Sequence, residues 1–354
     1  MSEASEWEFL GPRLVAVSPF PPANDGIGTY CQQLVETLAA AGRTVLRVGL
    51  PGGGGDAVER LAGRLRPLRL LGHARPGDEL LVMYHPHYFV KGHWRERMFT
   101  YASLLALTRL RRTTFVVHEV DDPVPLDFGP IGSRAVALEE ALRRRLWSRR
   151  VRLVFHTEWE RSEFAERFPA TDREEHLVTH GAFFTTSVSA SKAEAREQLG
   201  LAPDRVALLC IGYLSPEKPD KAYDVAMRAV GEAGVDGLDL HVVGSPIARP
   251  VPEVAEYVEM LRALAAERES VHMHERFVSD EEFDLWIRAA DALVLPYRAA
   301  TSSGVAARAS LLGTPMIGRR VGGIADQLGP DDVGFESDEE LVDAIREFAA
   351  RPER

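Results

Sequence analysis

Short apolar runs alternate along the first half of the chain with longer stretches that place apolar side chains at helical spacing. The runs are rich in β-branched residues, as expected of strands that are buried on both faces of a sheet. They lie at 13–18, 44–49, 79–85, 113–119 and 151–156. Amphipathic segments such as 29–42 separate them and are long enough to form the crossover helices of a parallel sheet. The first half therefore predicts a doubly wound α/β domain.

The second half repeats this pattern. Its apolar runs lie at 205–212, 239–245, 271–275, 292–297 and 314–318. Between the halves, residues 183–204 are rich in Ser and Thr and then become helical, which is typical of a linker. We place the boundary near residue 186 and predict two Rossmann-like domains, 1–186 and 187–354. Ligands of such sheets bind beyond the carboxyl ends of the strands, so we expect the two sheets to face an interdomain cleft.

The composition is that of an ordinary globular protein, with 45% hydrophobic and 27% charged residues in a chain of 354. Cys31 and Cys210 lie far apart in apolar surroundings, which favours two buried reduced thiols over a disulfide or a metal pair. No run of about twenty apolar residues is present, and the acidic start lacks the apolar core of a secretory signal. We therefore predict a cytoplasmic protein, with an enzyme as the default.

The charge is unevenly distributed. Residues 1–180 contain 24 Lys and Arg against 23 Asp and Glu, whereas the rest of the chain contains 18 against 30. Neither half has the strongly basic character of a nucleic-acid-binding domain, so we expect no nucleic-acid partner. Two basic clusters, 108–113 and 141–152, fit solvated helix faces. Docking of 141–152 to anionic lipid, which would make the protein membrane-peripheral, is the alternative.

A glycine-containing loop follows the first predicted strand. Gly26 and Gly28 precede the helix there, so their backbone N–H groups and the helix N-terminus could bind an anion. A tight structural turn explains the two glycines equally well. The third glycine of the dinucleotide fingerprint is missing, which disfavours NAD as a ligand.

A second loop places hydroxyls and backbone amides at the start of a helix. Ser302, Ser303, Gly304 and Val305 follow a predicted strand and open a helix that ends at Gly313. Helix N-terminal amides together with two hydroxyls are well suited to bind a diphosphate.

Lysine is rare in this sequence, with four residues against thirty-eight arginines. Lys218 and Lys221 lie three residues apart in the loop after the strand 205–212. Lysine is a point charge suited to phosphate oxygens, whereas the arginine fork favours planar bidentate contacts. The pair therefore indicates a phosphate site, and the alternative is a solvated loop with weak surface ion pairs.

Histidines stand at the ends of the predicted strands of the first domain. They are His85, His87, His118, His156 and His180. One such histidine is ordinary, but five at one sheet edge indicate a shared site. After His118, the carboxylates of Glu119 and Asp121 could hold a divalent ion or position an acceptor hydroxyl. A zinc site lacks its usual paired-ligand spacing, so we predict no metal.

Together these segments resemble the retaining, nucleotide-sugar-dependent glycosyltransferases of the GT-B fold, in particular family 4. The similar segments run through nearly the whole chain in the family's order. They include PPANDGIGTYCQQLVETLAAAGRTVLRVG, VVHEVDD, VTHGAFF, IGYLSPEKPDKAYDVAMRAV, LHVVGS, AADALVLPY and GTPMIGRRVGGIAD.

The resemblance implies transfer of a sugar from a nucleotide diphosphate sugar to an acceptor hydroxyl with retention of configuration. It implies an acceptor-binding first domain with His118 near the transferred sugar, and a donor-binding second domain. The family's diphosphate-binding lysine corresponds to Lys218 by its spacing from the strand and to Lys221 by its spacing to the helix. The implied front-face mechanism needs no cofactor or metal, and the acceptor is unknown.

Three positions depart from the family pattern. Tyr213 stands where the family often has an arginine, and Ala300 and Arg308 stand where it usually has glutamates that bind the sugar and the ribose. Arg308 could turn toward phosphate or a neighbouring acid such as Asp326, or be a solvent-exposed helix residue. Because a guanidinium only donates hydrogen bonds, the ribose needs another acceptor, and Glu275 is the first candidate.

Two other functions stay open. A nucleotide-sugar epimerase can share the fold, but the missing acids at 300 and 308 weigh against it. A glycosyltransferase-like subunit that binds ligand with little or no turnover is favoured by Tyr213 and the missing glutamates. The retained lysines, the SSGV segment and His118 oppose that interpretation.

Overall fold

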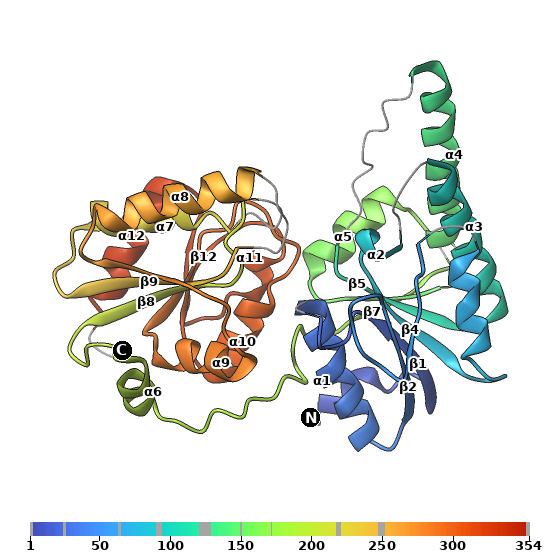
Figure 1. Ribbon diagram of the computed structural model, residues 1–354, viewed down its shortest axis with the longest axis horizontal. Helices are drawn as coiled ribbons and strands as arrows, with labels where there is room; N and C mark the ends of the chain where they lie inside the picture. The colour runs from blue at the N-terminus through green and yellow to red at the C-terminus, as the bar shows by residue number, and fades with distance from the viewer. Residues whose placement is uncertain are drawn as a thin grey trace. The chain divides into compact units, whose positions relative to one another are not determined.

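The computed structural model describes residues 3–23, 26–62, 65–89, 94–119, 129–148, 151–170, 172–216, 221–246 and 252–351. The chain divides into two compact units, Met1–Phe184 and Thr185–Arg354 (Figure 1). Each unit is a parallel sheet with helices packed against it, so the predicted α/β class with two Rossmann-like domains is confirmed. The sequence placed the boundary near residue 186, and the division falls between Phe184 and Thr185.

The first unit contains a seven-stranded parallel sheet in the order β3-β2-β1-β4-β5-β6-β7. Its strands are β1 Arg13–Ser18, β2 Thr44–Gly49, β3 Ala57–Val58, β4 Glu79–Tyr84, β5 Thr113–Val117, β6 Arg152–Phe155 and β7 Glu174–Leu177. Its helices are η1 Glu3–Trp7, α1 Gly26–Ala40, η2 Arg66–Gly72, α2 Pro86–Phe89, α3 Trp94–Leu110, α4 Gly129–Trp147 and α5 Glu158–Arg167. One face of the sheet packs on α3, α4 and α5 through an aromatic core, in which Tyr84 meets Trp147 edge-on at 4.9 Å between ring centroids.

The second unit contains a six-stranded parallel sheet in the order β10-β9-β8-β11-β12-β13. Its strands are β8 Val206–Ile211, β9 Leu238–Gly244, β10 Val271–Glu275, β11 Ala292–Leu295, β12 Met316–Arg319 and β13 Val333–Phe335. Its helices are α6 Lys192–Leu199, α7 Tyr223–Ala233, α8 Pro252–Ala266, α9 Asp280–Ala289, α10 Gly304–Leu312, α11 Ile324–Gln327 and α12 Asp338–Ala349.

Strand periodicity divides the core of the second unit between the two faces of its sheet. Leu208 and Cys210 pack with α7, α8 and α12, whereas Leu209 and Ile211 pack with α9 and α10. These two groups of helices cover opposite faces of the sheet (Figure 1). Successive side chains of a strand point to opposite faces, so a strand covered on both sides is apolar throughout. The short strands β3, β7 and β13 were not predicted. The sequence of β7, EEHL, has no apolar run to mark it.

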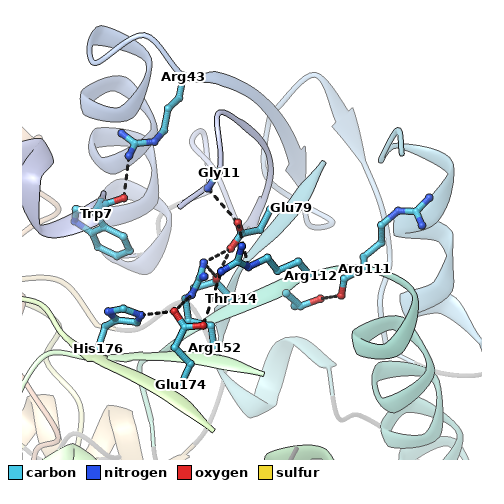
Figure 2. A network of polar contacts seen from close by, with 11 residues as sticks. Trp7, Gly11, Arg43, Glu79, Arg111, Arg112, Thr114, Arg152, Glu174 and His176 are labelled. Atoms are coloured by element: carbon cyan, nitrogen blue, oxygen red, sulfur yellow. Dashed lines mark hydrogen bonds and ion pairs between the residues drawn. The ribbon is translucent and has the colours of Figure 1, made fainter. Parts of the chain in front are cut away.

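Buried charged groups close the amino edge of the first sheet (Figure 2). Glu79 at the start of β4 accepts hydrogen bonds from the Arg152 guanidinium and the Thr114 hydroxyl, both at 2.6 Å. Its other oxygen accepts a hydrogen bond from the Gly11 amide at 3.1 Å. Arg152 in turn donates to Glu174 at the start of β7 at 2.8 Å. The starts of four neighbouring strands are thus tied together by one network.

The amino edge of the second sheet is closed in a similar way. Asp291, just before β11, accepts a hydrogen bond from the Ala207 amide of β8 at 2.7 Å. The same carboxylate pairs with Arg196 and Lys192 of α6. These contacts occupy the edge opposite to the one where ligands of such sheets bind, so the loops that follow the strands are the candidates for function.

Candidate functional site

Two neighbouring strands of the second unit, β8 and β11, carry the predicted phosphate-binding segments at their carboxyl ends. The strands are hydrogen-bonded neighbours in parallel register. Lys221 lies in the loop after β8, and Ser303 precedes α10 in the loop after β11. The fold therefore brings the lysine loop and the SSGV segment to one edge of one sheet. Lys218 lies outside the described residues.

Lys221 is held by an aromatic residue that the sequence analysis did not single out. Its ammonium donates a hydrogen bond to the Tyr297 hydroxyl at 2.8 Å and lies 4.6 Å from the centroid of the Tyr297 ring. A Cβ added to Gly212 would lie 3.1 Å from the same Lys221 nitrogen. The ammonium therefore packs against the glycine that ends β8 and against the tyrosine that follows β11.

The backbone around Lys221 has a local conformation that is unusual for its residue type. Ala222, between Lys221 and α7, has φ 48° and ψ 44°, the left-handed conformation that glycine adopts readily. The next residue, Tyr223, donates its backbone N–H to the Tyr257 hydroxyl at 2.9 Å. This turn fixes the start of α7 and with it the direction of the lysine.

The SSGV segment begins α10 as predicted, and the helix ends at Gly313 in the left-handed conformation. The Ser303 hydroxyl caps the helix by accepting the Ala306 amide at 3.3 Å. The Gln327 side chain fixes the Ser303 backbone by accepting its N–H at 2.8 Å and donating to its carbonyl at 3.1 Å. The amides of Gly304 and Val305 have no acceptor within the helix. Ser303 is thus a helix cap, and those amides are the groups positioned for an anion.

Arg308 is buried in the second unit, at 8% exposure, so the interpretation as a solvent-exposed helix residue is wrong. Its guanidinium donates to the Asp284 carboxylate at 2.9 Å and to the Thr185 carbonyl at 3.0 Å. Burial raises the pKa of Asp284 in spite of this cation. Asp284 lies on α9 and gave no signal in the sequence, because it stands among the other acids that begin that helix.

Glu275, the predicted ribose acceptor, lies at the end of the edge strand β10. Both of its carboxylate oxygens accept hydrogen bonds from Arg262, at 2.8 and 2.7 Å. Strand β9 separates β10 from β8 in the sheet, so the structure does not bring Glu275 together with Lys221 or the start of α10. Its role toward ribose stays a prediction.

In the first unit, three of the five predicted histidines meet around a buried tyrosine. The Tyr30 ring lies 5.0 Å from His118, 5.2 Å from His156 and 5.5 Å from His180, measured between centroids. The His118 Nε2 is 3.4 Å from the sulfur of Met83. The sequence could not single out Tyr30, because it lies within the apolar pattern of α1.

Burial lowers the pKa of two of these imidazoles, those of His118 and His156, and so favours their neutral form. The pKa of His118 is well below its usual value, first because of burial and then because of the neighbouring imidazoles of His156, His180 and His85. Burial also lowers the pKa of His156 to about 4, although its Nδ1 contacts the Val178 carbonyl at 3.1 Å. A neutral imidazole can donate one hydrogen bond and accept another, which suits a sugar hydroxyl.

His85, His87 and Glu119 follow the neighbouring strands β4 and β5, as His118 does. His85 contacts Glu119 at 2.9 Å and stacks on His87 with 5.1 Å between centroids. Asp121 lies outside the described residues. Within the described ranges, no group of three or more His, Cys, Asp and Glu side chains is arranged to hold a metal ion.

Gly26 and Gly28 do not precede the helix, as predicted, but lie in its first turn, because α1 begins at Gly26; the two glycines differ in their surroundings. A Cβ on Gly28 would lie 2.1 Å from the Pro19 carbonyl oxygen, whereas one on Gly26 would meet nothing within 4 Å. Gly28 is therefore required by close packing of the loop, as in the structural-turn interpretation. Cys31, three residues later, is a free buried thiol, and burial raises its pKa to about 12.

The basic segment 141–152 is less exposed than its sequence suggests. Arg143 and Arg152 are buried, at 1% and 3% exposure, and Arg143 lies over the rings of Tyr101 and Phe168. Arg144 has an exposed side chain. Of the four arginines of this segment that the structure describes, two thus lie inside the unit, and Arg144 and Arg145 are exposed. Among the described helices, none has the length and apolar character that crossing a membrane would need.

Residues 205–351 match the family model described as Glycosyl transferases group 1. The chain is 31% identical over 180 residues to D-inositol 3-phosphate glycosyltransferase 2 of Catenulispora acidiphila, which covers 49% of this chain and 41% of that protein. It is 29% identical over 283 residues to the D-inositol 3-phosphate glycosyltransferase of Streptomyces avermitilis. That match covers 75% of this chain and 55% of that protein. The match to the first of these relatives thus spans less than half of that protein's length.

Solved structures with a similar fold align over nearly the whole chain. Sucrose-phosphate synthase from Thermosynechococcus elongatus has a TM-score of 0.68 at 16% identity, covering 96% of this chain and 90% of that one. HepE of Anabaena in complex with UDP has a TM-score of 0.67 at 14% identity, and the match covers 95% of this chain and 89% of that one.

Proposed function

Since the chain has the GT-B fold and its residues 205–351 belong to the group 1 glycosyl transferases, we propose that this protein is a retaining glycosyltransferase. It transfers a sugar from a nucleoside diphosphate sugar to an acceptor hydroxyl. The second unit holds the donor, and the first unit holds the acceptor.

The observation that carries this proposal is the pairing of Lys221 with the start of α10 at one edge of the sheet. Lys221 follows β8 and α10 follows β11, and these strands are direct neighbours. An ammonium group and the N-terminus of a helix both favour phosphate. One edge therefore offers a cation and the amides of Gly304 and Val305 to the two phosphates of a donor.

The chemistry follows from the placement of positive charge. In front-face transfer, the bond between the sugar's anomeric carbon and the diphosphate oxygen breaks, and the acceptor oxygen bonds to that carbon on the same face. The acceptor's proton passes to the departing diphosphate. Lys221 and the helix amides stabilise the negative charge that develops there. No metal takes part in this scheme, and turnover that persists in excess EDTA is the expected check.

His118 contributes a neutral imidazole on the acceptor side. Because its pKa is held well below the usual value, it acts by hydrogen bonding to a sugar or acceptor hydroxyl and not as a cation. His118→Ala should lower turnover while the affinity for the nucleoside diphosphate stays within about twofold, or ~0.4 kcal/mol. Unchanged turnover in the folded variant would remove His118 from the site.

The direct test of the donor site is calorimetry with UDP, GDP, ADP and dTDP on the full chain. HepE was solved with UDP and with UDP-glucose, so the uridine nucleotide is the first probe. Lys221→Ala should weaken the tightest-binding nucleotide by about tenfold or more, the loss of a hydrogen bond from a charged group. Lys218→Ala is measured beside it, because Lys218 is the other candidate lysine of this loop. Equal affinity of wild type and Lys221→Ala would overturn the assignment.

A binding subunit with little turnover is the second candidate, and the Arg308–Asp284 ion pair favours it. Arg308 stands at the position where the family usually has a ribose-binding glutamate, and its charge is paired with Asp284. Incubation with the corresponding nucleotide sugars, followed by nucleotide release and mass spectrometry, separates the two functions. Binding without release of the nucleotide, in the presence of a panel of hydroxyl acceptors, would support the subunit.

A further inference from the structure

We propose that Tyr297 is a positioning residue for the diphosphate: it fixes the Lys221 ammonium before the ligand binds. This inference rests on the proposed function, because it concerns how the donor site is prepared. Tyr297 follows β11 and Lys221 follows β8, so the contact joins two loops that are 76 residues apart in the chain.

The first argument is that Lys221 makes two different contacts with one side chain. Its Nζ donates to the Tyr297 hydroxyl at 2.8 Å and lies 4.6 Å from the ring centroid. The hydroxyl contact fixes the direction of one N–H, and the ring attracts the cation through its quadrupole. An ammonium group has three donors. Among the described residues the other two have no acceptor, so they are available to phosphate oxygens.

The second argument is that Tyr297 is itself immobile. It is 1% exposed and belongs to the apolar core between the sheet and helices α9 and α10. Most of its side chain is therefore fixed by packing, and only the hydroxyl end meets a polar group. A rigid anchor of this kind lowers the conformational entropy that a flexible lysine loses when a ligand binds.

The third argument is that Gly212 and Ala222 shape the space around the ammonium. A Cβ on Gly212 would lie 3.1 Å from the Lys221 Nζ and 3.2 Å from the Tyr223 hydroxyl. A side chain there would force the Lys221 ammonium or the Tyr223 hydroxyl to shift by a few tenths of an ångström. Ala222, in the left-handed conformation, turns the chain into α7 directly after Lys221. The backbone at Gly212 and Ala222 and the Tyr297 side chain thus all favour the same position of the Lys221 ammonium.

The test is a double-mutant cycle on the full chain, with Tyr297→Phe, Lys221→Met and the combined variant. The probes are UDP, uridine and inorganic pyrophosphate, measured by calorimetry. Tyr297→Phe keeps the ring and removes the hydroxyl, and we expect about fivefold weaker binding of UDP. Uridine, which has no phosphate, should bind equally to wild type and variant. Pyrophosphate should follow UDP.

The combined variant tells whether Tyr297 acts through Lys221. If it does, the combined variant should bind UDP no more weakly than Lys221→Met alone, because residues that act as a unit are not additive. Fully additive losses, or a uridine affinity that falls with the UDP affinity, would overturn the inference and leave Tyr297 a packing residue. Thr314→Val is the matched control, since it removes a buried hydroxyl of the same unit that donates to the Ile287 carbonyl at 3.0 Å and does not contact Lys221.

Failure of the inference and failure of the proposed function give different results. If Lys221→Met leaves UDP and pyrophosphate binding unchanged, the donor-site assignment is wrong and the inference falls with it. If Lys221→Met weakens binding and Tyr297→Phe does not, the donor site stands and the positioning role of Tyr297 is refuted.

Discussion

The amino and carboxyl edges of the two sheets use polar groups in opposite ways. At the amino edges, Glu79 and Asp291 are buried, and each accepts hydrogen bonds from both a guanidinium and a backbone amide. At the carboxyl edges, Lys221 donates to the Tyr297 hydroxyl, and burial lowers the pKa values of His118 and His156. Buried ion pairs at the amino edges stabilise the fold, whereas a lysine beside a helix N-terminus and imidazoles held neutral are groups that can bind a ligand.

This comparison also explains why charge along the sequence is a poor guide to function. Arg152 belongs to a basic cluster that we interpreted as a helix face or a lipid-binding surface, yet it is buried in the amino-edge network. Lys221 was one of two candidate lysines; the structure places it in the loop after β8, against Tyr297, and Lys218 lies outside the described residues. Arg152 and Lys221 differ in the edge of the sheet on which they lie: Arg152 is at an amino edge, and Lys221 is at a carboxyl edge.

The largest effect is expected from breaking the amino-edge network. Arg152→Met leaves the buried Glu79 carboxylate without its buried ion-pair partner, with only the exposed Arg112 at 4.0 Å, and should lower the free energy of unfolding by about 3 kcal/mol. The measurement is urea unfolding followed by circular dichroism. Arg144→Met is the control, since its exposed pair with Glu140 should contribute at most about 0.5 kcal/mol. Similar losses in the two variants would contradict the division between edges.

Arg308 tests whether an ion pair near the carboxyl edge can be structural. Arg308→Glu places a second carboxylate against buried Asp284 and should cost about 3 kcal/mol of stability. The charge swap Arg308→Glu with Asp284→Arg should recover at least half of that loss. A folded Arg308→Glu of normal stability and tighter UDP binding would instead support a ribose-binding role for a carboxylate at this position.

Acid should destabilise the first unit through its buried histidines. The folded pKa of His156 is about 4, below the usual value of 6.5, so the unfolded chain binds the proton first. Stability is then complete above pH 6.5 and falls as the pH drops toward 4. Between pH 6.5 and 5 this one group should cost about 2 kcal/mol.

The measurement is urea unfolding at a series of pH values for wild type and His156→Asn. The variant should lose less stability than wild type over the same interval, because it lacks the titrating group. Parallel curves for the two proteins would show that His156 is not held neutral.

The smallest effect concerns the turn before α7. Ala222→Gly relieves the left-handed strain of a Cβ-bearing residue and should stabilise the second unit by about 0.5 kcal/mol after the higher chain entropy of glycine is subtracted. Ala226→Gly, inside the same helix, should instead destabilise by about 1 kcal/mol. Thermal unfolding of both variants is the check. A destabilised Ala222→Gly would mean that packing of the buried methyl outweighs the backbone strain.

Hydrophobic periodicity allowed most of the architecture to be predicted. Strands covered on both faces must be apolar throughout, so the central strands of both sheets were recognisable. The edge strand β7 was not, because two of its four residues, Glu174 and Glu175, are carboxylates. The helix start at Ser303 and its end at Gly313 were also predictable, since capping depends on local backbone chemistry.

The partners of the site residues were not predictable. Arg308 finds Asp284 on another helix 24 residues earlier, and Lys221 finds Tyr297 across two neighbouring strands. Tyr30 and Tyr297 lie within apolar patterns and carried no chemical signal of their own. Such contacts are long-range, and the sequence specifies them only through the fold.

The sequence by itself determined the α/β class, the two Rossmann-like domains and the loops in which chemistry is concentrated, because these depend on local periodicity and on turn and cap residues. The tertiary structure alone decided which charged groups are neutralised by the protein and which keep capacity for a ligand. Strand order places Lys221 beside the start of α10 and separates both from Glu275. Parallel strands bring distant loops to one edge, and burial then sets the charge state of each group there.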